Sequence, residues 1–442
     1  MKSHRQPWRP SVTALLLVAL ITLSAVGETS RVLPGDDLQQ AIDAADEGET
    51  LLLTAGVHRG PVTVSQPLTL RGEGDASIVG TGIGSVLTVE ADRVRVEQLE
   101  IRGSGRDLSK DDAGILITGD KARIIDVTLH NNLHGIYVRG GKNVRLVGNT
   151  VVGLAATEET PRVIGGEAAN RDDGIHHSPP GVRALMGNGL HLWDANGAIV
   201  DNNLVQHVRD GIYVAHTHQA EFRRNRIHHS RYAIHYMYSS DNVVADNELW
   251  RNVAGAALMF SQNLDVHGNI LRDHSGFRAY GLLLQNVDAS RFHDNAIRGN
   301  RVGLRLQNSS TNTFRDNRVV GNLAGMTLNS SSRENQFTRN RIGPNLRQIE
   351  LTGPAPPTEW SVAGVGNRWS GVLPMDLTGD GISQWPHHEV DLMAERREEF
   401  PYVQLLTGSP GIRAVEWSLS RAPVPGMRFI TDPHPLTRDR DD

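Results

Sequence analysis

The sequence has no cysteine, few aromatic residues and no strong excess of charge of either sign. The lack of cysteine excludes disulfides, thiolate metal ligands and a cysteine nucleophile. Aromatic residues make up only 5% of the 442 residues, and the formal net charge is -5. Because a basic surplus is missing, the composition argues against a nucleic-acid partner. The chain is instead rich in glycine, with 45 residues, which suits many tight turns around a narrow interior.

The first residues have the pattern of a secretory signal. Lys2, Arg5 and Arg9 precede an apolar run over residues 12–26, and small residues follow before a plausible cleavage point. The run of about 15 residues is short for a bilayer span, which needs about 20. We therefore expect residues 1–27 to be a signal peptide that directs export. An uncleaved membrane anchor is the alternative.

A repeat of about 22 residues organises the chain between residues 50 and 345. Its anchor is a small residue followed by an apolar–variable–apolar triplet, as in GLHL, GIYV and AIHY. The main series of anchors is Gly189, Gly211, Ala233, Gly255, Gly281, Gly303 and Gly325, with one step of 26 residues and the others of 22. A period near 22 made of short alternating strands is typical of a β-solenoid. The sequence therefore predicts an all-β fold, a right-handed parallel β-helix of about nine to twelve coils.

Alternation along each strand assigns side chains to the two faces of the coil. The first and third residues after an anchor should point inward, and the second and fourth outward. In four coils an Asn stands eight residues before the anchor, and its amide can bond to the next coil. These residues are Asn225, Asn247, Asn295 and Asn317.

The repeat also sets the expected domain boundaries. We expect the β-helix over residues 28–345, beginning with an amphipathic helix within residues 36–47 that covers the open end of the stack. The period is interrupted over 154–187, which we interpret as an insertion loop. Residues 346–442 form an irregular C-terminal extension, with a short helix over 388–400 and an extended tail after it.

Histidine and methionine gather on the outward positions of the middle coils. The outward position two residues after the anchor contains His191, Tyr213, His235 and Ala257 on successive coils. The outward position four residues after the anchor contains Trp193, Ala215, Met237 and Met259. Neighbouring coils are about 4.8 Å apart, so the two methionines should be neighbours with His235 beside them. Two thioethers with imidazoles and no thiols suit transiently bound Cu(I), a soft ion. The candidate metal site comprises Met237, Met259, His235, His216, His218 and His191; ordinary packing beneath the insertion or a partner protein is the alternative.

Three further motifs suggest chemistry but have simpler interpretations. Paired carboxylates with imidazoles occur at 171–177 (RDDGIHH), as in pectin-type hydrolases, yet they fall in the insertion and not on a strand. The segment 376–381 (DLTGDG) has part of a calcium-loop pattern without its remaining acidic ligands, so we expect a turn. The segment 432–435 (DPHP) lies in the tail, away from the coils, and we expect no catalytic residues there.

Longer stretches of the sequence resemble a known family. They are ETLLLTAGVHRGPVTVSQPLTLRGEG, NRIHHSRYAIHYMYSSDNVVADNEL, the late Asn367-Arg-Trp and DLTGDGISQWP. Together with the signal and the helical cap, they resemble the NosD family of periplasmic maturation factors for nitrous oxide reductase. The resemblance covers essentially all of residues 28–442, and HYMYS and DLTGDGI are its most specific parts.

The resemblance implies a β-helix with a non-enzymatic task in the periplasm. It implies copper supply to nitrous oxide reductase, with copper received from a copper-chaperone lipoprotein. It also implies attachment to the inner membrane through an ABC-type ATPase–permease pair, on which we expect residues 346–442 to dock. We further expect that residues 401–442 can be deleted without unfolding the β-helix. No ligand motif is carried over, so the candidate site rests on coil geometry.

A periplasmic polysaccharide lyase or hydrolase on the same fold is the alternative function. Such an enzyme needs an acidic pair or a basic residue, with aromatic sugar platforms, along one sheet face. The outward columns after the anchors Gly189 to Gly325 contain no carboxylate. This absence favours a binding protein over an enzyme.

Overall fold

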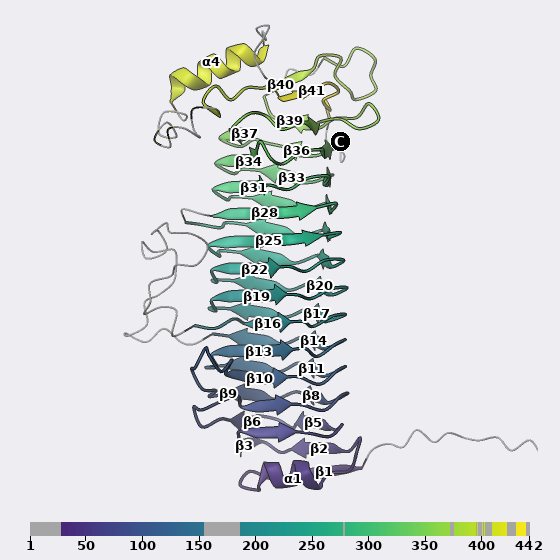
Figure 1. Cartoon of the computed structure of the whole chain (residues 1–442), viewed down its shortest axis with the longest axis vertical. Helices are drawn as coiled ribbons and strands as arrows, with labels where there is room; N and C mark the ends of the chain where they lie inside the picture. Colours follow the sequence, from purple (N-terminus) through teal and green to yellow (C-terminus); the bar gives the residue numbers. More distant parts are fainter. Residues whose placement is uncertain are drawn as a thin grey trace, which may run out of the picture.

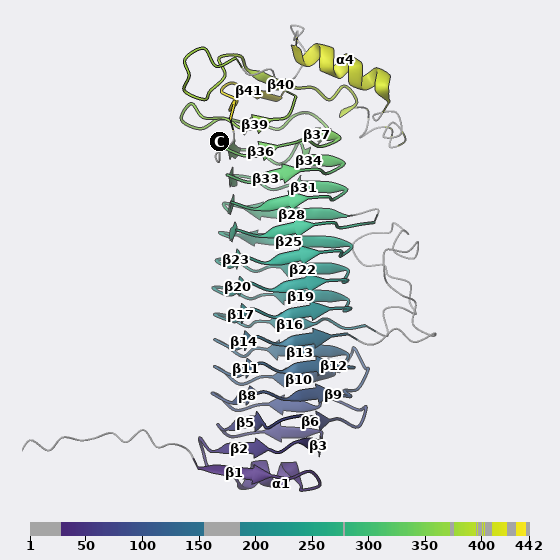
Figure 2. The same ribbon diagram turned by 180° about the vertical axis from the view of Figure 1, so that it is seen from behind.

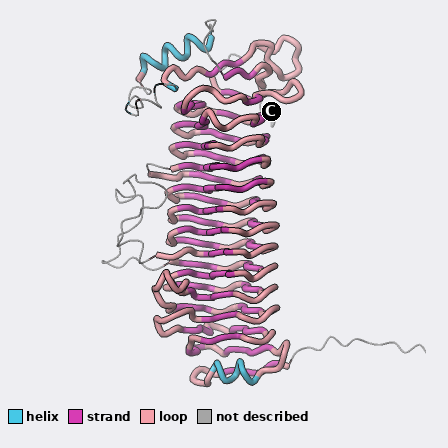
Figure 3. Tube along the Cα trace, in the orientation of Figure 1, coloured by secondary structure: helices cyan, strands magenta, loops and turns pink. Residues whose placement is uncertain are grey.

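The chain winds into a stack of coils. The computed structural model describes residues 28–153, 186–276, 279–371, 375–394, 396, 400, 402, 409–421 and 430–438. Within these residues almost every coil contributes one short strand to each of three parallel sheets (Figure 1). Figure 3 shows the same path as a tube, in which strands and turns alternate around the stack. The predicted all-β parallel β-helix is therefore confirmed.

The three sheets, here called A, B and C, run along the stack, and each pairs its strands in parallel. In the described residues sheet A contains β1 (Thr29–Val32), β2 (Thr50–Leu53), β5 (Thr69–Gly72), β8 (Arg95–Glu97), β11 (Arg123–Ile125), β14 (Arg145–Val147), β17 (Ile199–Asp201), β20 (Glu221–Arg223), β23 (Val243–Ala245), β26 (Asp265–His267), β29 (Arg291–His293), β32 (Thr313–Arg315), β35 (Asn335–Thr338) and β38 (Thr358–Glu359). Sheet B contains β3 (Gly56–Arg59), β6 (Ala76–Val79), β9 (Glu100–Arg102), β12 (Thr128–His130), β15 (Thr150–Val152), β18 (Leu204–Gln206), β21 (Arg226–His228), β24 (Glu248–Trp250), β27 (Ile270–Arg272), β30 (Ala296–Arg298), β33 (Arg318–Val320), β36 (Arg341–Ile342) and β39 (Arg368–Trp369). Sheet C contains β4 (Val62–Val64), β7 (Leu87–Val89), β10 (Ala113–Ile117), β13 (His134–Arg139), β16 (Leu190–Trp193), β19 (Asp210–Ala215), β22 (Tyr232–Met237), β25 (Ala254–Gln262), β28 (Tyr280–Asp288), β31 (Val302–Gln307), β34 (Ala324–Asn329) and β37 (Arg347–Thr352).

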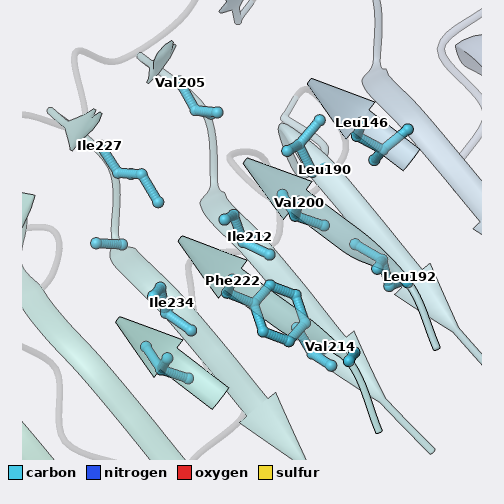
Figure 4. Packing of buried hydrophobic residues seen from close by; sticks show 14 of the residues in the cluster. Leu146, Leu190, Leu192, Val200, Val205, Ile212, Val214, Phe222, Ile227 and Ile234 are labelled. Carbon is cyan, nitrogen blue, oxygen red and sulfur yellow. The ribbon is translucent and has the colours of Figure 1, made fainter. Parts of the chain in front are cut away.

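One side of every sheet faces a common apolar interior. Leu192 and Val214 of sheet C point toward Val200 and Phe222 of sheet A, and all four are fully buried (Figure 4). The anchors must be small because stacked backbones approach closely there. A Cβ at Gly211 would lie 2.5 Å from the carbonyl oxygen of the next anchor, which excludes larger residues without a shift of the chain.

A ladder of buried asparagines connects the coils between sheets A and B. The amide nitrogen and the backbone N–H of each Asn both donate to the Oδ1 of the Asn one coil further on. The Nδ2–Oδ1 distances lie between 2.8 and 3.0 Å along Asn149, Asn203, Asn225, Asn247, Asn269, Asn295, Asn317, Asn340 and Asn367. The predicted stacking of Asn225, Asn247, Asn295 and Asn317 is confirmed. Each amide also donates to a carbonyl of the preceding coil, so it connects three coils.

The stack begins with a short helix whose side chains close the edge of a sheet. Helix α1 (Leu38–Ala44) buries Leu38 and Ile42 and is capped by Asp37. The Gln39 side chain bonds to both backbone groups of Thr63 in β4, the edge strand of sheet C. Its amide donates to the carbonyl at 3.0 Å and its oxygen accepts from the N–H at 2.7 Å. The exposed edge of β4 is thereby satisfied.

The C-terminal part differs from the expected boundaries. Coils continue through β37 and β38 to β39, beyond residue 345. His387–Glu389 form strand β40, antiparallel to β41 (Ile430–Asp432), and helix α4 (Pro410–Arg421) occupies the tail that was expected to be extended. Of residues 388–400, Ala394 and Arg396 are helical, so a helix over the whole range is wrong. Figure 2 shows β40, β41 and α4 together at one end of the stack.

Asp432 of the tail completes the asparagine ladder. Its Oδ2 accepts from the backbone N–H of Asn367 at 2.7 Å and from the indole N–H of Trp369 at 2.8 Å. Asp432 is fully buried. Deleting 401–442 would leave these buried donors without an acceptor and should destabilise the last coils. That the β-helix as a whole stays folded after this deletion stays a prediction.

The ladder generates a first prediction. Replacing Asn247 by Ala should lower the free energy of unfolding by about 2–4 kcal/mol, because the buried donors of Asn225 lose their acceptor. Urea unfolding followed by circular dichroism measures the change. Gln262→Ala is the control, since Gln262 is exposed at the end of β25 and takes no part in the ladder, and it should stay within about 0.5 kcal/mol. Equal losses in both variants would contradict a stabilising ladder.

A second prediction concerns His274, which stands in a similar column between sheets B and C. Its Nδ1 accepts from the backbone N–H of Asn252, and the backbone N–H of His274 donates to the Oδ1 of Asn300. Burial lowers the pKa of His274 to about 3 from an ordinary 6.5. The unfolded chain therefore binds this proton first as the pH falls, and the folded state loses stability between pH 6.5 and 3, by up to about 1.4 kcal/mol per pH unit.

His274→Asn should remove that pH dependence, because Asn is the residue of the neighbouring coils and does not titrate. Urea midpoints measured for both proteins from pH 7 to pH 4 should diverge, with the wild type losing more stability in acid. Parallel curves would contradict the buried neutral state of His274.

Candidate functional site

The predicted metal residues lie along the outward side of sheet C. Strands β16, β19, β22 and β25 follow one another in this sheet (Figure 1). The register pairs His191 with Tyr213 and Tyr213 with His235 in one column. In the neighbouring column Met237 pairs with Met259. The structure therefore brings the two methionines together on adjacent coils, with His235 two residues before Met237 on the same face.

This outward side is more buried than its position on the coil suggests. Met259 is only 2% exposed and His235 only 8%. With Ala257 and Leu283, Met259 forms an apolar cluster separate from the central core, and Met237 packs against it. The residues do point away from the interior, as the alternation predicts, but neighbouring side chains cover them. Any ion bound here would lie in surroundings of low polarity.

His235 is oriented by an ion pair whose carboxylate is fully buried and whose guanidinium is partly exposed. Its Nδ1 lies 2.9 Å from the Oδ2 of Asp210, a carboxylate with no exposed surface. Arg231 donates to the same carboxylate from Nε at 2.8 Å and from Nη2 at 2.6 Å. Burial alone would raise the pKa of Asp210, but the Arg231 guanidinium and the His235 N–H together hold this pKa well below its usual range. Asp210 is therefore a carboxylate that can only accept.

The second nitrogen of His235 has no partner in the part of the chain that the structure describes. Because the Asp210 carboxylate accepts, the proton of neutral His235 resides on Nδ1, and Nε2 presents a lone pair. That Nε2 is buried and makes no hydrogen bond within the described structure. A carboxylate that orients a histidine whose other nitrogen is available is the usual second-sphere arrangement of a metal-ligating histidine. The fit of His235 to a metal thus rests on an orphaned buried nitrogen.

Tyr213 lies between the two histidines of the column. Its ring packs edge-on against His191, with centroids 4.7 Å apart, and against His235 at 5.1 Å. Its hydroxyl donates toward the Met237 sulfur at 3.9 Å. Tyr213 therefore separates His191 from the methionines and helps to fix the Met237 side chain.

His191 is oriented for a different chemistry from His235. Its Nδ1 lies 3.4 Å from the amide nitrogen of Asn188, whose oxygen accepts from Arg209. The amide nitrogen must therefore donate, so the proton of His191 is on Nε2, which is buried and has no partner among the described residues. Burial, with His134 and Arg209 nearby, lowers the pKa of His191. In this tautomer Nε2 is a donor and not a metal ligand.

The other two histidines lie in the turns after β19. His218 accepts from the backbone N–H of Ser240 at Nδ1, 3.1 Å away, which places its proton on Nε2 as well. His216 is exposed, and its ring packs between Trp193 and Tyr238, with centroids 5.0 and 5.4 Å away. Of the six candidate residues, Met237 and Met259 share the apolar cluster. His235 precedes Met237 by two residues on strand β22, and His216 lies at the exposed rim in the turn after β19. His191 and His218 have other partners.

The described residues offer no metal site of the usual kind, which is built from His, Asp and Glu side chains. They contain no group of three or more His, Asp or Glu side chains arranged to hold an ion. His207, His228 and His229 do gather at a corner between sheets B and C, but their rings pack against one another. Burial and the two neighbouring imidazoles lower the pKa of His228 to about 4. A site with three side-chain ligands from the described residues therefore has to include a ligand of another kind, such as methionine.

The remaining sequence motifs have structural roles or are not described. The segment 171–177 lies outside the described residues. In 376–381 the Asp376 carboxylate accepts from the backbone of Gly379 and Gly381, as the expected turn requires. In 432–435, Asp432 completes the asparagine ladder.

Sequence reasoning missed Asp210 and Arg231. A signal existed for the first, because Asp210 directly precedes the anchor Gly211. The corresponding residues of the other anchors from Gly189 to Gly325 are all uncharged. A charged residue at a position that is uncharged in the other coils indicates that a nearby group compensates its charge.

Comparison with known proteins identifies the family. A family described as "Periplasmic copper-binding protein (NosD)" matches residues 167–373. A protein from Stutzerimonas stutzeri, named "Probable ABC transporter binding protein NosD", is 30% identical over 87% of this chain and 86% of its own length. The chain belongs to the NosD family. A relative of the same name from Pseudomonas aeruginosa is also 30% identical, over 96% of this chain and 95% of its own.

Solved structures resemble the fold of this NosD-family chain. A family 28 exopolygalacturonase from Yersinia enterocolitica has a TM-score of 0.50 at 12% identity, covering 75% of this chain and 77% of its own. At this identity the likeness concerns the β-helix alone. In the described part of the chain, no helix combines the length and apolar character needed to cross a bilayer.

Proposed function

We propose that this protein carries Cu(I) on the outward side of sheet C and delivers it to apo-nitrous oxide reductase. The single observation that carries the proposal is the buried Nε2 of His235, which has no partner among the described residues and belongs to the strand whose Met237 is in register with Met259 of the next coil. The family description as periplasmic and copper-binding supports it. Copper is cargo in this proposal and not a resident cofactor.

The chemistry of the donor set points to a soft ion. Thioether sulfur binds Cu(I) well and is a poor ligand for hard cations such as Mg²⁺ or Ca²⁺. One imidazole and two thioethers provide three neutral ligands, which is enough for Cu(I). His216 at the exposed rim offers a further imidazole through which the ion can enter or leave. Such a site holds its ion exchangeably, as a carrier must.

The proposed partners follow from the family. Its relatives are named as binding proteins of an ABC transporter. We infer that this chain works in the periplasm, bound to the inner membrane through an ABC-type permease and its ATPase. The copper donor would be a copper-chaperone lipoprotein, and the acceptor the reductase.

The C-terminal end of the stack has the surface that such docking requires. Helix α4 fully buries none of its side chains. Val415 and Trp417 of this helix are 50% and 63% exposed, and Leu377 and Trp385 nearby in the extension are 76% and 62% exposed. Exposed apolar side chains that gather at one end of a protein are typical of an interaction surface. We infer that this surface contacts the permease.

A binding function fits the described residues better than polysaccharide cleavage. Among strands β16, β19, β22 and β25 of sheet C, the carboxylate is Asp210, and it is fully buried and paired with Arg231. It therefore has no access to a polysaccharide, and its pKa is lowered where a general acid needs a raised one. We therefore propose that the protein is not an enzyme.

The copper proposal predicts a specific loss of binding. The double variant Met237→Leu/Met259→Leu keeps the volume of both side chains and removes both sulfurs. Its Cu(I) affinity should fall at least about a hundredfold, or about 2.7 kcal/mol, in an anaerobic competition titration with a chromophoric chelator. Binding by the wild type that persists in this variant would contradict the assignment.

Met326→Leu is the matched control for that titration. Met326 is 1% exposed and belongs to the central core, where no solvent-borne ion arrives. Its replacement should leave Cu(I) binding unchanged. His235→Gln, which removes the lone pair of Nε2, should weaken binding like the double variant.

The docking proposal predicts a loss of capture by the transporter. Val415→Ser/Trp417→Ser should weaken capture of the detergent-solubilised ATPase–permease pair at least about tenfold, because the apolar contact area is lost. Leu323→Ser is the control, since Leu323 is 56% exposed on the side of the β-helix. Capture at full strength by the α4 variant, or equal weakening by the control, would rule out α4 as the contact.

A further inference from the structure

We propose that the Asp210–Arg231 ion pair makes the site at His235, Met237 and Met259 selective for monovalent soft cations over divalent ones. The proposal concerns Cu(I) and Ag(I) against Zn(II) and Cu(II). It rests on the proposed function, because it assigns a specificity-determining role to residues behind the proposed ligands. Asp210 and Arg231 do not contact the ion themselves.

The ligands and their support add no net charge to the ion. Neutral His235 and the two thioethers are uncharged. Asp210 is negative, but Arg231 binds both of its oxygens and cancels its charge. A bound ion would therefore keep its full charge.

The apolar residues around the proposed site disfavour an ion of high charge. Ala257 is fully buried, Met259 is 2% exposed and Leu283 is 7% exposed. The cost of moving an ion from water into a medium of low polarity rises with the square of its charge, so a divalent ion costs about four times as much as a monovalent one. Without an anionic ligand to offset this cost, the site discriminates by valence as well as by softness.

The ion pair separates two effects that a carboxylate usually has together. A lone carboxylate behind a ligating histidine both orients the ring and increases its attraction for Zn(II). Asp210 still orients His235, because its Oδ2 accepts from Nδ1. The attraction is removed, because the bidentate Arg231 neutralises the carboxylate. The histidine is therefore fixed without becoming a strong ligand for divalent ions.

A double-mutant cycle tests this proposal. Wild type, Asp210→Asn, Arg231→Met and the double variant are each titrated with Ag(I) alone and with Zn(II) alone. Arg231→Met leaves an uncompensated carboxylate, so the ratio of Zn(II) to Ag(I) affinity should rise at least about tenfold. Asp210→Asn leaves an uncompensated guanidinium, so that ratio should fall. The double variant is neutral again and should return to within about threefold of the wild-type ratio.

Both methionines stay in place throughout the cycle, so softness is constant and only charge changes. Ratios that stay constant across folded single variants, or that move in the same direction in both, would overturn the proposal. Circular dichroism and thermal unfolding show which variants fold, because removing one partner of a buried ion pair is strongly destabilising.

A second pair of variants keeps the proposal testable if the single variants do not fold. Leu283→Glu adds a carboxylate one coil above Ala257 and leaves the ion pair intact. Its Zn(II) to Ag(I) ratio should rise about tenfold, and Leu283→Gln should not change it. An unchanged ratio in folded Leu283→Glu would overturn the proposal.

The outcome for the wild type distinguishes the two levels of inference. If it binds neither Ag(I) nor Cu(I), the proposed copper function itself fails. If it binds both ions at the methionines while its selectivity is independent of the ion pair, only the present inference fails.

Discussion

The fixed register between coils is the constraint on which the rest of the structure depends. Each ladder asparagine accepts from one neighbour and donates to the next, so a slip of one residue would break several buried hydrogen bonds at once. The same register stacks the outward columns of sheet C. Met237 meets Met259, and His235 follows Tyr213, because the ladder holds their coils in step. The positions of the candidate site residues are therefore determined by the same repeat that stabilises the fold.

The sequence contains enough information to predict the fold and the columns, because both follow from a period. The 22-residue spacing of the anchors fixes the coil, and strand alternation decides which residues share a face. The prediction failed where no period applies. Helix α4 lies in a segment without repeats, and its residues were expected to be extended.

The chemistry of the candidate site could be predicted only in part. Coil geometry placed Met237, Met259 and His235 together, but it could not show which nitrogen of each histidine has a lone pair. That depends on partners from other segments, such as Asp210 for His235 and Ser240 for His218. The burial of Met259 was also not predicted, because it depends on packing against residues of adjacent coils. Periodicity thus predicts position, and tertiary contacts decide function.

The two ends of the stack are closed in unequal ways. At the base, Gln39 satisfies the edge at Thr63 from only 24 residues away in sequence. At the top, Asp432 receives the last donors of the ladder from a position 65 residues beyond Asn367. A contact formed over a short loop recovers quickly after it breaks, whereas one formed over a long loop costs more chain entropy to restore. Thermal fraying should therefore start at the C-terminal end and travel toward the base, so that the coils with the histidines and methionines open after the C-terminal coils and before those at the base.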